Sequence, residues 1–375
     1  MTDSNPTSSL PLNEVVTEVR GQVGFITLHR PKALNALSLS MIRTLTQCLL
    51  AWRDNPDVAA VAIRGTNKSG PFGAFCAGGD IRFFHQAALA GNLELEDFFT
   101  EEYALNHLIH NYPKPYVAFM DGIVMGGGMG ISQGARIRLV TERTKMAMPE
   151  THIGLFPDVG GGYFLSRCPG HTGEWLALTG TLLGAGEALA LGLADACLDV
   201  EQLATAWEAL ASLKLQEAGA LASWLALYSI APSVDGIRAR EQIDQYFSLP
   251  TVLDMVQALE ASDDDWAQHT AATLRQRSPL MLQVTLEQVR RARGMTLVDD
   301  LRMERDLVQH CFQPLHLGRS ASQSETVEGI RALAVDKDHS PRWNPARIED
   351  VSTGMVAPFF VSPWTPDSHP LRSLA

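Results

Sequence analysis

The first 140 residues alternate between short apolar runs and polar or glycine-rich turns. Residues 14–20 and 23–29 are rich in β-branched side chains and flank Gly21-Gln22, a pattern that predicts a β-hairpin. Residues 58–63 form a continuous apolar run, which is typical of a strand buried on both faces of a sheet. The same reasoning predicts two further buried strands, at 115–120 and 136–141.

A different spacing, of three to four residues, predicts helices between these strands. Residues 39–53 and 95–111 both place apolar side chains at this spacing, and a short third helix is predicted from about Met129. Two glycine-rich turns, within 73–82 and 126–128, each follow a predicted strand and precede a predicted helix. Strand, glycine turn and helix in this repeated order indicate an α/β fold.

The second half of the chain has another pattern. After Val200 no further strand is predicted, residues 201–335 read as helices rich in Ala, Leu, Glu and Gln, and 336–345 read as a loop. A chain of 375 residues exceeds the usual size of one compact core. We therefore expect three parts: a flexible N-terminus (1–12), an α/β core (13–200) and a helical C-terminal region (201–375).

Composition narrows the class of protein. Hydrophobic residues make up 46% of the chain and charged residues 19%, which fits a soluble globular enzyme. The net charge of −12 argues against binding to nucleic acid. No apolar run reaches the roughly 20 residues of a membrane span, and residues 1–10 lack the features of a secretory signal or transit peptide. We expect a cytoplasmic protein that does not bind membranes.

Neither cysteine nor histidine spacing indicates a metal site. The five cysteines are scattered, odd in number and without a CxxC pair, so we expect reduced thiols in the core. The eleven histidines include no HExxH motif. We expect no bound metal and no separate cofactor.

The two glycine turns could polarise a carbonyl group. Gly78-Gly79 and Gly126-Gly127-Gly128 lie where a strand ends and a helix begins, so their backbone N–H groups have no partner within the helix. Two such turns facing each other would form an oxyanion hole. The alternative is that these glycines serve close packing or simple turns. A dinucleotide fingerprint is a weaker interpretation, because GxGxxG starting at Gly126 would need a third glycine where Ile131 stands.

Two carboxylates eight positions apart follow the second turn. Glu150 has apolar neighbours, and burial would raise its proton affinity and make it a base or nucleophile. Its alternative is a buried glutamate bonded to backbone amides. Asp158 precedes Val159 and a glycine run, so it is either a catalytic group or the N-cap of a helix that begins at Val159.

A third carboxylate, Glu102, lies on the apolar face of the predicted helix 95–111. Phe98, Leu105 and Ile109 share that face with it. A carboxylate in such a place either pairs with a buried partner, or it meets the substrate or orients another carboxylate.

A serine-hydrolase motif also deserves a test. Residues Gly130 to Gly134 match GxSxG with Ser132 at the centre. That motif requires the serine on the strand-to-helix turn, but the turn here is already made by the earlier glycines. We therefore expect Ser132 inside a helix and not as a nucleophile.

Three motifs stand out in the sequence: FCAGGDIR at 75–82, GIVMGGGMG at 122–130 and AMPETHIGLFPDVGGGYF at 147–164. Together they closely resemble the crotonase (enoyl-CoA hydratase/isomerase) superfamily, and within it the 3-hydroxyisobutyryl-CoA hydrolase group. The third motif is long and specific, and the similarity continues through nearly the whole chain after the first dozen residues.

The resemblance implies a crotonase-type spiral of ββα turns with a mainly helical C-terminal extension, and a CoA thioester as substrate. By motif position, the amides of Gly79 and Gly127 are the two oxyanion donors. Glu150 corresponds to the superfamily's active-site glutamate, Asp158 to the hydrolase group's aspartate, and Glu102 to a glutamate that contacts substrate. CoA is then part of the substrate and not a cofactor, and a homo-oligomer is possible in such a family.

One departure from the hydratase pattern bears on the reaction. Hydratases of this superfamily use two glutamates, and the first of them corresponds to Gly130 here. Addition of water to an enoyl-CoA should therefore be poor, and thioester hydrolysis is the leading hypothesis. The alternatives are a crotonase-type lyase or isomerase with Glu150 as base, and a CoA-ester-binding protein with an inactive site. Any role of His152 stays open.

The residues that hold the CoA phosphates are not identified by these motifs. Basic residues close to the first glycine turn are candidates, namely Arg30, Lys32 and Arg82.

Overall fold

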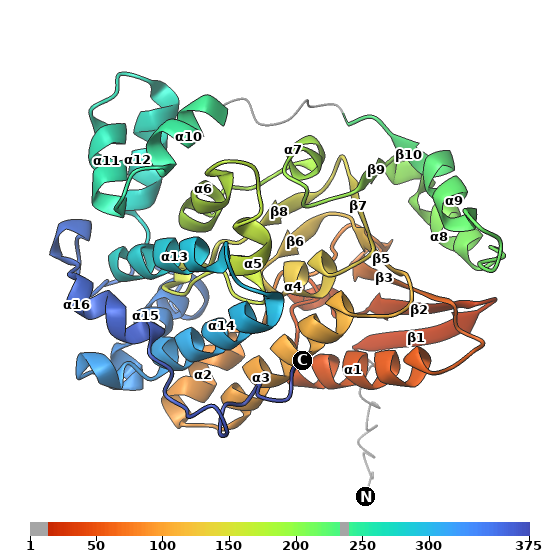
Figure 1. Ribbon diagram of the computed structural model, residues 1–375, viewed down its shortest axis with the longest axis horizontal. Coiled ribbons are helices and arrows are strands. Elements are labelled where there is room, and N and C mark those ends of the chain that lie inside the picture. The colour runs from red at the N-terminus through yellow and green to blue at the C-terminus, as the bar shows by residue number, and fades with distance from the viewer. Residues whose placement is uncertain (1–13, 233–239) are drawn as a thin grey trace, which may run out of the picture.

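The computed structural model describes residues 14–232 and 240–375, and its strands form a large and a small sheet (Figure 1). The predicted flexible N-terminus, 1–12, lies outside the described residues. In the large sheet the strands follow the order β1-β2-β3-β5-β7-β9-β10, with β4 paired to β3. Their bounds are β1 Val15–Arg20, β2 Val23–Leu28, β3 Ala60–Asn67, β4 Gly70–Pro71, β5 Tyr116–Met120, β7 Ile137–Thr141, β9 Ala196–Leu198 and β10 Ser229–Ile230.

The strands predicted from apolar runs are confirmed. β1 and β2 form the antiparallel hairpin, with Val15 opposite Leu28. β2, β3, β5, β7 and β9 then pair in parallel, which explains why the central strands are apolar on both faces. β3 begins later and ends later than predicted. Short β9 and β10 were not predicted, and the absence of strands after Val200 was wrong, because β10 is too short to show a periodic pattern.

The small sheet stands beside the carboxyl ends of the large one. β6 (Ile123–Met125) and β8 (Lys145–Ala147) pair in parallel. Single bridges extend this sheet on both sides, from Cys76 to Val124 and from Met146 to Leu183. The chain thus passes repeatedly from a large-sheet strand to a small-sheet position and then to a helix. This is the expected spiral of ββα turns.

Helices surround the sheets and form most of the C-terminal half (Figure 1). The helix predicted at 39–53 is found at those bounds, and that predicted at 95–111 is displaced by one residue. The helices are α1 Leu39–Arg53, α2 Ile81–Ala90, α3 Glu94–His110, α4 Gly127–Gln133, α5 Gly161–Leu165, α6 Thr172–Thr179, α7 Ala185–Ala190, α8 Leu203–Leu210, α9 Ala220–Tyr228, α10 Arg240–Phe247, α11 Val252–Glu260, α12 Asp265–Arg275, α13 Pro279–Ala292, α14 Leu297–Phe312, α15 Glu325–Ile330 and α16 Thr353–Val356.

Two hydrophobic cores lie on opposite faces of the large sheet. A smaller core joins Phe25 and Phe119 of the sheet to Trp207 of α8 and Trp224 of α9. The larger core continues from the sheet into helices α1 to α3 and on to α13 and α14. The C-terminal helices therefore share one core with the strands and glycine turns, and they help to build whatever site those turns form.

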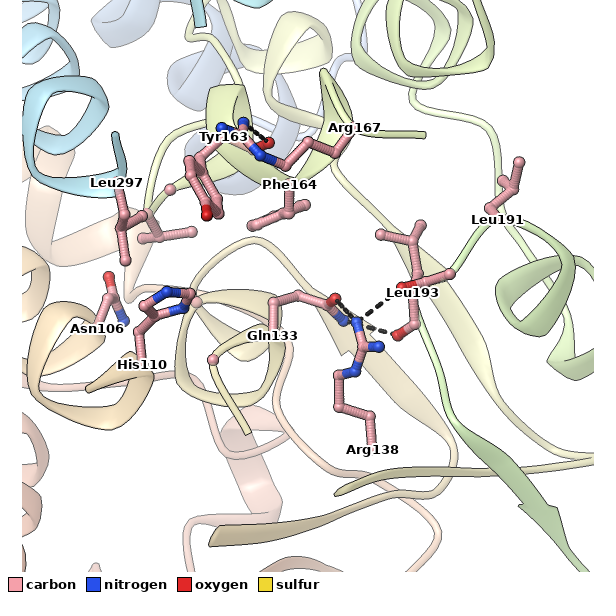
Figure 2. A pocket seen from close by; sticks show the side chains of 15 residues that line it. Asn106, His110, Gln133, Arg138, Tyr163, Phe164, Arg167, Leu191, Leu193 and Leu297 are labelled. Carbon is pink, nitrogen blue, oxygen red and sulfur yellow. Dashed lines mark hydrogen bonds between the residues drawn. The ribbon is translucent and has the colours of Figure 1, made fainter. Parts of the chain in front are cut away.

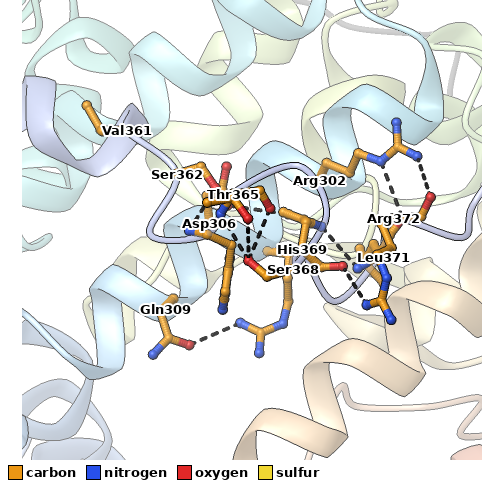
Figure 3. A network of polar contacts seen from close by, with 12 residues as sticks. Arg302, Asp306, Gln309, Val361, Ser362, Thr365, Ser368, His369, Leu371 and Arg372 are labelled. Carbon is orange, nitrogen blue, oxygen red and sulfur yellow. Dashed lines mark hydrogen bonds and ion pairs between the residues drawn. The ribbon is translucent and has the colours of Figure 1, made fainter.

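The last residues of the chain are fastened to α14 (Figure 3). Arg302 donates to the carbonyl oxygen of Leu374 at 2.7 Å, and Asp306 accepts from the Ser362 hydroxyl at 2.7 Å and lies 3.4 Å from Nε2 of His369.

Among the described residues, no helix is long and apolar enough to cross a lipid bilayer.

Candidate active site

A cavity of about 240 Å³, called the acid cavity below, brings together the three predicted carboxylates and the two predicted oxyanion donors, Gly79 and Gly127. Its wall includes both glycine turns and three carboxylates, and an aromatic and aliphatic surface completes it. Its lining residues are Ala77, Gly78, Gly79, Ile81, Phe84, Phe99, Glu102, Met125, Gly126, Gly127, Pro149, Glu150, His152, Ile153, Leu155, Asp158, Val159 and Leu333.

The two glycine turns lie directly against each other. A Cβ atom at Gly127 would lie 3.4 Å from the amide nitrogen of Gly79, and one at Gly78 would lie 3.7 Å from the amide nitrogen of Gly127. Gly78 and Gly126 have φ angles of +104° and +48°, which only glycine adopts readily. Within the described residues, neither amide, Gly79 nor Gly127, donates a hydrogen bond. Two adjacent free donors therefore line the acid cavity.

An aromatic cluster supports the first turn. Phe84 of α2 packs on Phe98 and Phe99 of α3, with ring centroids 4.7 Å and 4.9 Å away. A Cβ atom at Gly79 would lie 2.5 Å from the Phe84 ring. Residue 79 must therefore be glycine for this cluster to pack against the turn.

Glu150 begins the short 3-10 helix η2 (Glu150–Ile153) and is only 6% exposed. Its Oε1 would lie 2.8 Å from a Cβ atom at Gly126, so the carboxylate faces the second glycine turn. Its buried Oε2 has no hydrogen-bond partner in the described part of the chain. Burial, with Asp158 nearby, raises the pKa of Glu150 well above its usual value. A carboxylate satisfied by backbone amides would not leave this oxygen free.

Glu102 lies on α3, and its predicted place on the apolar face is confirmed. It is 2% exposed, and Phe98, Leu105 and Ile109 beside it are equally buried. Its Oε1 has no partner in the described residues and would lie 2.5 Å from a Cβ atom at Gly127. Burial and the charges of Asp158 and Glu150 raise its pKa well above the usual value. The alternative of a buried ion pair is wrong, because no cation pairs with it there.

Asp158 accepts a hydrogen bond of 2.8 Å from the hydroxyl of Tyr103 and is 5% exposed. Burial raises its pKa to about 6, against the lowering effect of that hydrogen bond. The predicted N-cap role is wrong. Val159 and Gly160 both have positive φ, so the chain makes a left-handed turn and α5 begins only at Gly161 with Gly160 as N-cap. The carboxylate is therefore left to the cavity and to Tyr103.

Two further buried acids, which were not predicted from the sequence, accept backbone amides of this turn on the side away from the acid cavity. Glu304 accepts the amides of Gly160 at 2.7 Å and Gly162 at 2.9 Å, and Asp300 accepts the amide of Tyr163 at 2.8 Å. Both acids lie on α14 and are fully buried. Burial raises the pKa of Asp300 to about 7 and that of Glu304 well above its usual value. They fix the turn that carries Asp158.

These supporting residues left only a weak signal in the sequence. Asp300 and Glu304 are four positions apart and lie in a helix with an apolar face. Glu102 likewise lies in a helix with an apolar face. Their partners lie about 140 residues earlier in the chain, and no local spacing connects the two. Tyr103 directly follows Glu102 in the sequence. Only the folded structure shows that its hydroxyl reaches Asp158, 55 positions later.

Ser132 is not a nucleophile. It lies within α4, is fully buried, and donates to the carbonyl oxygens of Gly128 and Met129 at 2.8 Å and 3.2 Å.

His152 lines the acid cavity with an exposed side chain, and its Nδ1 lies 3.1 Å from Nη1 of Arg277. Partial burial of the ring and the charge of that arginine lower the pKa of His152, so the imidazole is neutral near pH 7.

None of the three basic residues suggested for the CoA phosphates lines the acid cavity. Arg30 is paired with Glu14 at 3.0 Å and Asp80 at 2.7 Å, so its charge serves the first glycine turn. Lys32 and Arg82 are exposed and form no ion pair within the described residues. Their assignment stays a prediction.

In residues 14–232 and 240–375, no three or more His, Cys, Asp or Glu side chains gather in a group that could hold a metal ion. The five cysteines are unpaired, and Cys76 lies closest to the glycine turns. Burial raises the pKa of this thiol to about 12, which keeps it protonated. The chemistry available is that of two amide donors and three carboxylates.

Comparisons with known proteins agree with this geometry. Residues 23–360 match the family described as enoyl-CoA hydratase/isomerase. The chain is 39% identical over 349 residues to the mitochondrial 3-hydroxyisobutyryl-CoA hydrolase of Gallus gallus, covering 92% of this chain and 87% of that protein. It is 40% identical over 361 residues to the protein of the same name from Danio rerio, covering 95% and 91%.

Two solved structures are similar over nearly their whole length. A carnitinyl-CoA dehydratase from Mycobacterium thermoresistibile superimposes with a TM-score of 0.84 at 38% identity, covering 95% of this chain and 98% of that one. An enoyl-CoA hydratase from Rhodobacter sphaeroides superimposes with a TM-score of 0.82 at 34% identity, covering 94% and 98%.

Proposed function

The chain belongs to the enoyl-CoA hydratase/isomerase family, and from this premise we propose that it hydrolyses the thioester of a short 3-hydroxyacyl-CoA. The preferred substrate in this proposal is 3-hydroxyisobutyryl-CoA, the ester named for the Gallus gallus and Danio rerio relatives. The observation that carries the proposal is the acid cavity, in which two free amide donors lie beside three carboxylates.

The amides of Gly79 and Gly127 bind the thioester oxygen and stabilise the negative charge that develops on it during attack. Removing one such donor from an oxyanion hole typically slows a reaction by about 10²- to 10³-fold. Both donors are backbone groups held by packing, so they need no reorganisation at the moment of reaction.

Glu150 acts on the carbonyl carbon in one of two ways. As a nucleophile, it forms a mixed anhydride while the carbon–sulfur bond breaks, and the leaving thiolate takes a proton from Asp158. Water then cleaves the anhydride, which frees the acid and the Glu150 carboxylate, and Asp158 takes its proton back. As a base, Glu150 instead removes a proton from the water that attacks the thioester.

Asp158 serves both substrate recognition and proton transfer in this scheme. Its pKa of about 6 allows it to hold a proton in part of the molecules near neutral pH and to release it readily. Tyr103 fixes one carboxylate oxygen, and the other is available to the β-hydroxyl of the substrate. Glu102 closes the opposite wall and contacts the acyl group.

The surroundings of Gly130 favour hydrolysis over hydration. The hydratase pattern implied by the family resemblance places a second glutamate at this position. A Cβ atom at Gly130 would lie 2.7 Å from Cβ of Val159 and 2.9 Å from Nδ2 of Asn106, so a longer side chain does not fit without rearrangement.

A lyase or isomerase acting on a related CoA ester is the second candidate. The names of the two similar structures, a dehydratase and a hydratase, support it. In that case Glu150 would move a proton to or from the acyl chain while the same two amides hold the carbonyl oxygen.

A panel of acyl-CoA esters, with and without a β-hydroxyl, distinguishes these candidates. We expect free thiol from 3-hydroxyisobutyryl-CoA and 3-hydroxypropionyl-CoA, and at least about tenfold less from isobutyryl-CoA, because the latter leaves Asp158 without a partner. Loss of enoyl absorbance without free thiol would favour the lyase. Binding of every ester with turnover of none would indicate an inactive site.

Isotope labelling tests the anhydride route for Glu150. A single turnover in ¹⁸O-labelled water places label in the Glu150 carboxylate only if water attacks the glutamyl carbonyl of an anhydride. Label in the released acid alone is expected when Glu150 activates water directly, and also when water attacks the acyl carbonyl of the anhydride.

A further inference from the structure

A second cavity lies on the other side of the turn that carries Asp158. It measures about 230 Å³, and we call it the arginine pocket because Arg138 and Arg167 line it (Figure 2). Val159 lines both this pocket and the acid cavity. Of its two neighbours in the chain, Asp158 lines the acid cavity and Gly160 lines the arginine pocket. A single residue is therefore part of the wall between the two.

That wall is thin and strained. Val159 has a φ angle of +58°, a conformation that β-branched residues rarely adopt and that tends to persist at functional positions. Opposite it stands Gly130, where a Cβ atom would lie 2.7 Å from Cβ of Val159. Gly130 has no side chain, so the Val159 side chain packs directly against its backbone at this point of the wall.

Helix α3 carries a line of polar side chains past this wall. Glu102 lines the acid cavity, and Asn106 and His110, at the next two positions on the same helix face, line the arginine pocket. Asn106 is only 4% exposed, and neither its Oδ1 nor its Nδ2 has a hydrogen-bond partner in the described residues. A buried amide without partners is unfavourable unless a ligand or water satisfies it.

The charge of the arginine pocket differs from that of the acid cavity. Arg138 is neutralised by Asp195 at 2.8 Å. Arg167 forms no ion pair in the part of the chain that the structure describes; its guanidinium lies 3.5 Å from the Tyr163 ring centroid and donates to backbone carbonyl oxygens. Its side chain is exposed, as is that of His110, so the pocket reaches solvent. The charge of Arg167 lowers the pKa of buried Asp300 without forming an ion pair with it, so an anion entering the pocket meets a positive charge that is only partly compensated.

We propose that the arginine pocket binds the small hydroxy-carboxylate that hydrolysis releases, and that the acid leaves by this route past Val159. The inference rests on the proposed thioester hydrolysis. The freshly formed acid ionises among three buried carboxylates, where like charges repel it. The leaving CoA occupies the side of the glycine turns. Asn106 and Arg167 supply an amide and a cation that suit a carboxylate, and the volume suits a four-carbon acid but not CoA.

Equilibrium titration with 3-hydroxyisobutyrate tests this binding directly. We expect Asn106→Leu and Arg167→Gln each to weaken binding by about tenfold or more, since each removes a hydrogen bond to a charged group. Arg53→Gln, which changes an exposed arginine paired only with Asp54, is the matched control and should bind as the original chain does. Glu150→Gln should retain binding. Asn106→Leu should melt no earlier than the original chain, because it removes an unsatisfied buried amide.

First-turnover kinetics complete the test. Asn106→Leu should cleave the first equivalent of substrate at the original rate and then turn over more slowly, because release of the acid is impaired. Equal slowing of the first and later turnovers would place Asn106 in the chemistry and overturn the proposal. Acid binding that is lost in Glu150→Gln but kept in Asn106→Leu, or no binding to the original chain, would also overturn it. An original chain that binds the acid but cleaves no acyl-CoA would refute the proposed function alone.

Discussion

The protein buries two groups of carboxylates that are alike in burial but differ in what their oxygens meet. Glu102, Glu150 and Asp158 line the acid cavity, while Asp300 and Glu304 lie behind it on α14. All five are nearly inaccessible to solvent, and burial raises the pKa of each. In the acid cavity, Glu102 Oε1 and Glu150 Oε2 have no hydrogen-bond partner in the described residues. Glu304 instead accepts two backbone amides and Asp300 accepts one through Oδ2, and the remaining Oδ1 of Asp300, which has no partner there, lines neither cavity.

A raised pKa follows from burial alone and is shared by both groups, so the pKa does not distinguish a reactive carboxylate from a supporting one. Glu304 uses both of its oxygens to accept the amides of Gly160 and Gly162. Glu150 lines the acid cavity, and in the described residues its Oε2 has no partner and the two glycine amides near it donate no hydrogen bond. We therefore propose that an unpartnered oxygen on a cavity wall, and not the pKa shift, marks the carboxylates suited to react.

Glu150→Gln should have the largest effect on activity. We expect kcat to fall by roughly 10³-fold, because the amide can neither attack the thioester nor activate water. The free energy of unfolding should not fall, since the substitution keeps the shape and removes a buried charge. Thiol release and urea denaturation of the same preparation check both parts. Full thiol release from 3-hydroxyisobutyryl-CoA would show that Glu150 is not the catalytic group.

Glu304→Ala should instead act mainly on stability. Its removal leaves the amides of Gly160 and Gly162 buried without acceptors, and we expect the free energy of unfolding to fall by about 3 kcal/mol. Glu304→Gln should recover part of the loss, because the amide oxygen still accepts one of them. An unchanged denaturation midpoint for Glu304→Ala would mean that the two groups of acids do not differ as described.

Asp158→Asn should make the protein more stable at high pH and at the same time less active. Because the folded-state pKa of about 6 lies above the ordinary value of 3.8, the folded protein binds the proton more tightly than the unfolded chain. The wild-type protein therefore loses stability as the pH rises from about 4 through about 6. We expect the variant to be more stable by about 2 kcal/mol at pH 8, and equal at pH 4, with activity reduced. Melting temperatures across this pH range give the comparison. Equal pH dependence in both proteins would show that Asp158 is not the destabilising group.

Glu102→Gln should have the smallest effect of the four. If Glu102 contacts the substrate without taking part in the chemistry, KM rises about tenfold while kcat changes little. Steady-state kinetics with 3-hydroxyisobutyryl-CoA separate the two constants. A fall in kcat as large as that of Glu150→Gln would assign Glu102 a role in the reaction itself.

Local sequence patterns predict the residues that line the acid cavity well, and the residues that support them poorly. The apolar runs identify β2, β3, β5 and β7, and the glycines at their ends identify the two turns, because both signals lie within a few residues. The long third motif likewise includes Glu150 and Asp158. The packing of one turn against the other depends on the fold, and so does the cavity between them.

The rest depends on contacts between distant segments. The N-cap prediction for Asp158 failed because Val159 adopts positive φ, against the preference of a β-branched residue. That conformation is maintained by Glu304, which stands more than 140 positions later. Asn106 reads as an ordinary helix residue, and only the finished fold shows that its amide is buried and has no partner among residues 14–232 and 240–375.

The attachment of the final segment to α14 makes residues 362–374 part of the support for the reaction (Figure 3). Trimming these residues would remove partners of Arg302 and Asp306, which flank Glu304 within one helical turn on either side. An enzyme shortened in this way would keep every group that touches substrate. It should nevertheless inactivate sooner on warming, as the helix behind Asp158 loosens.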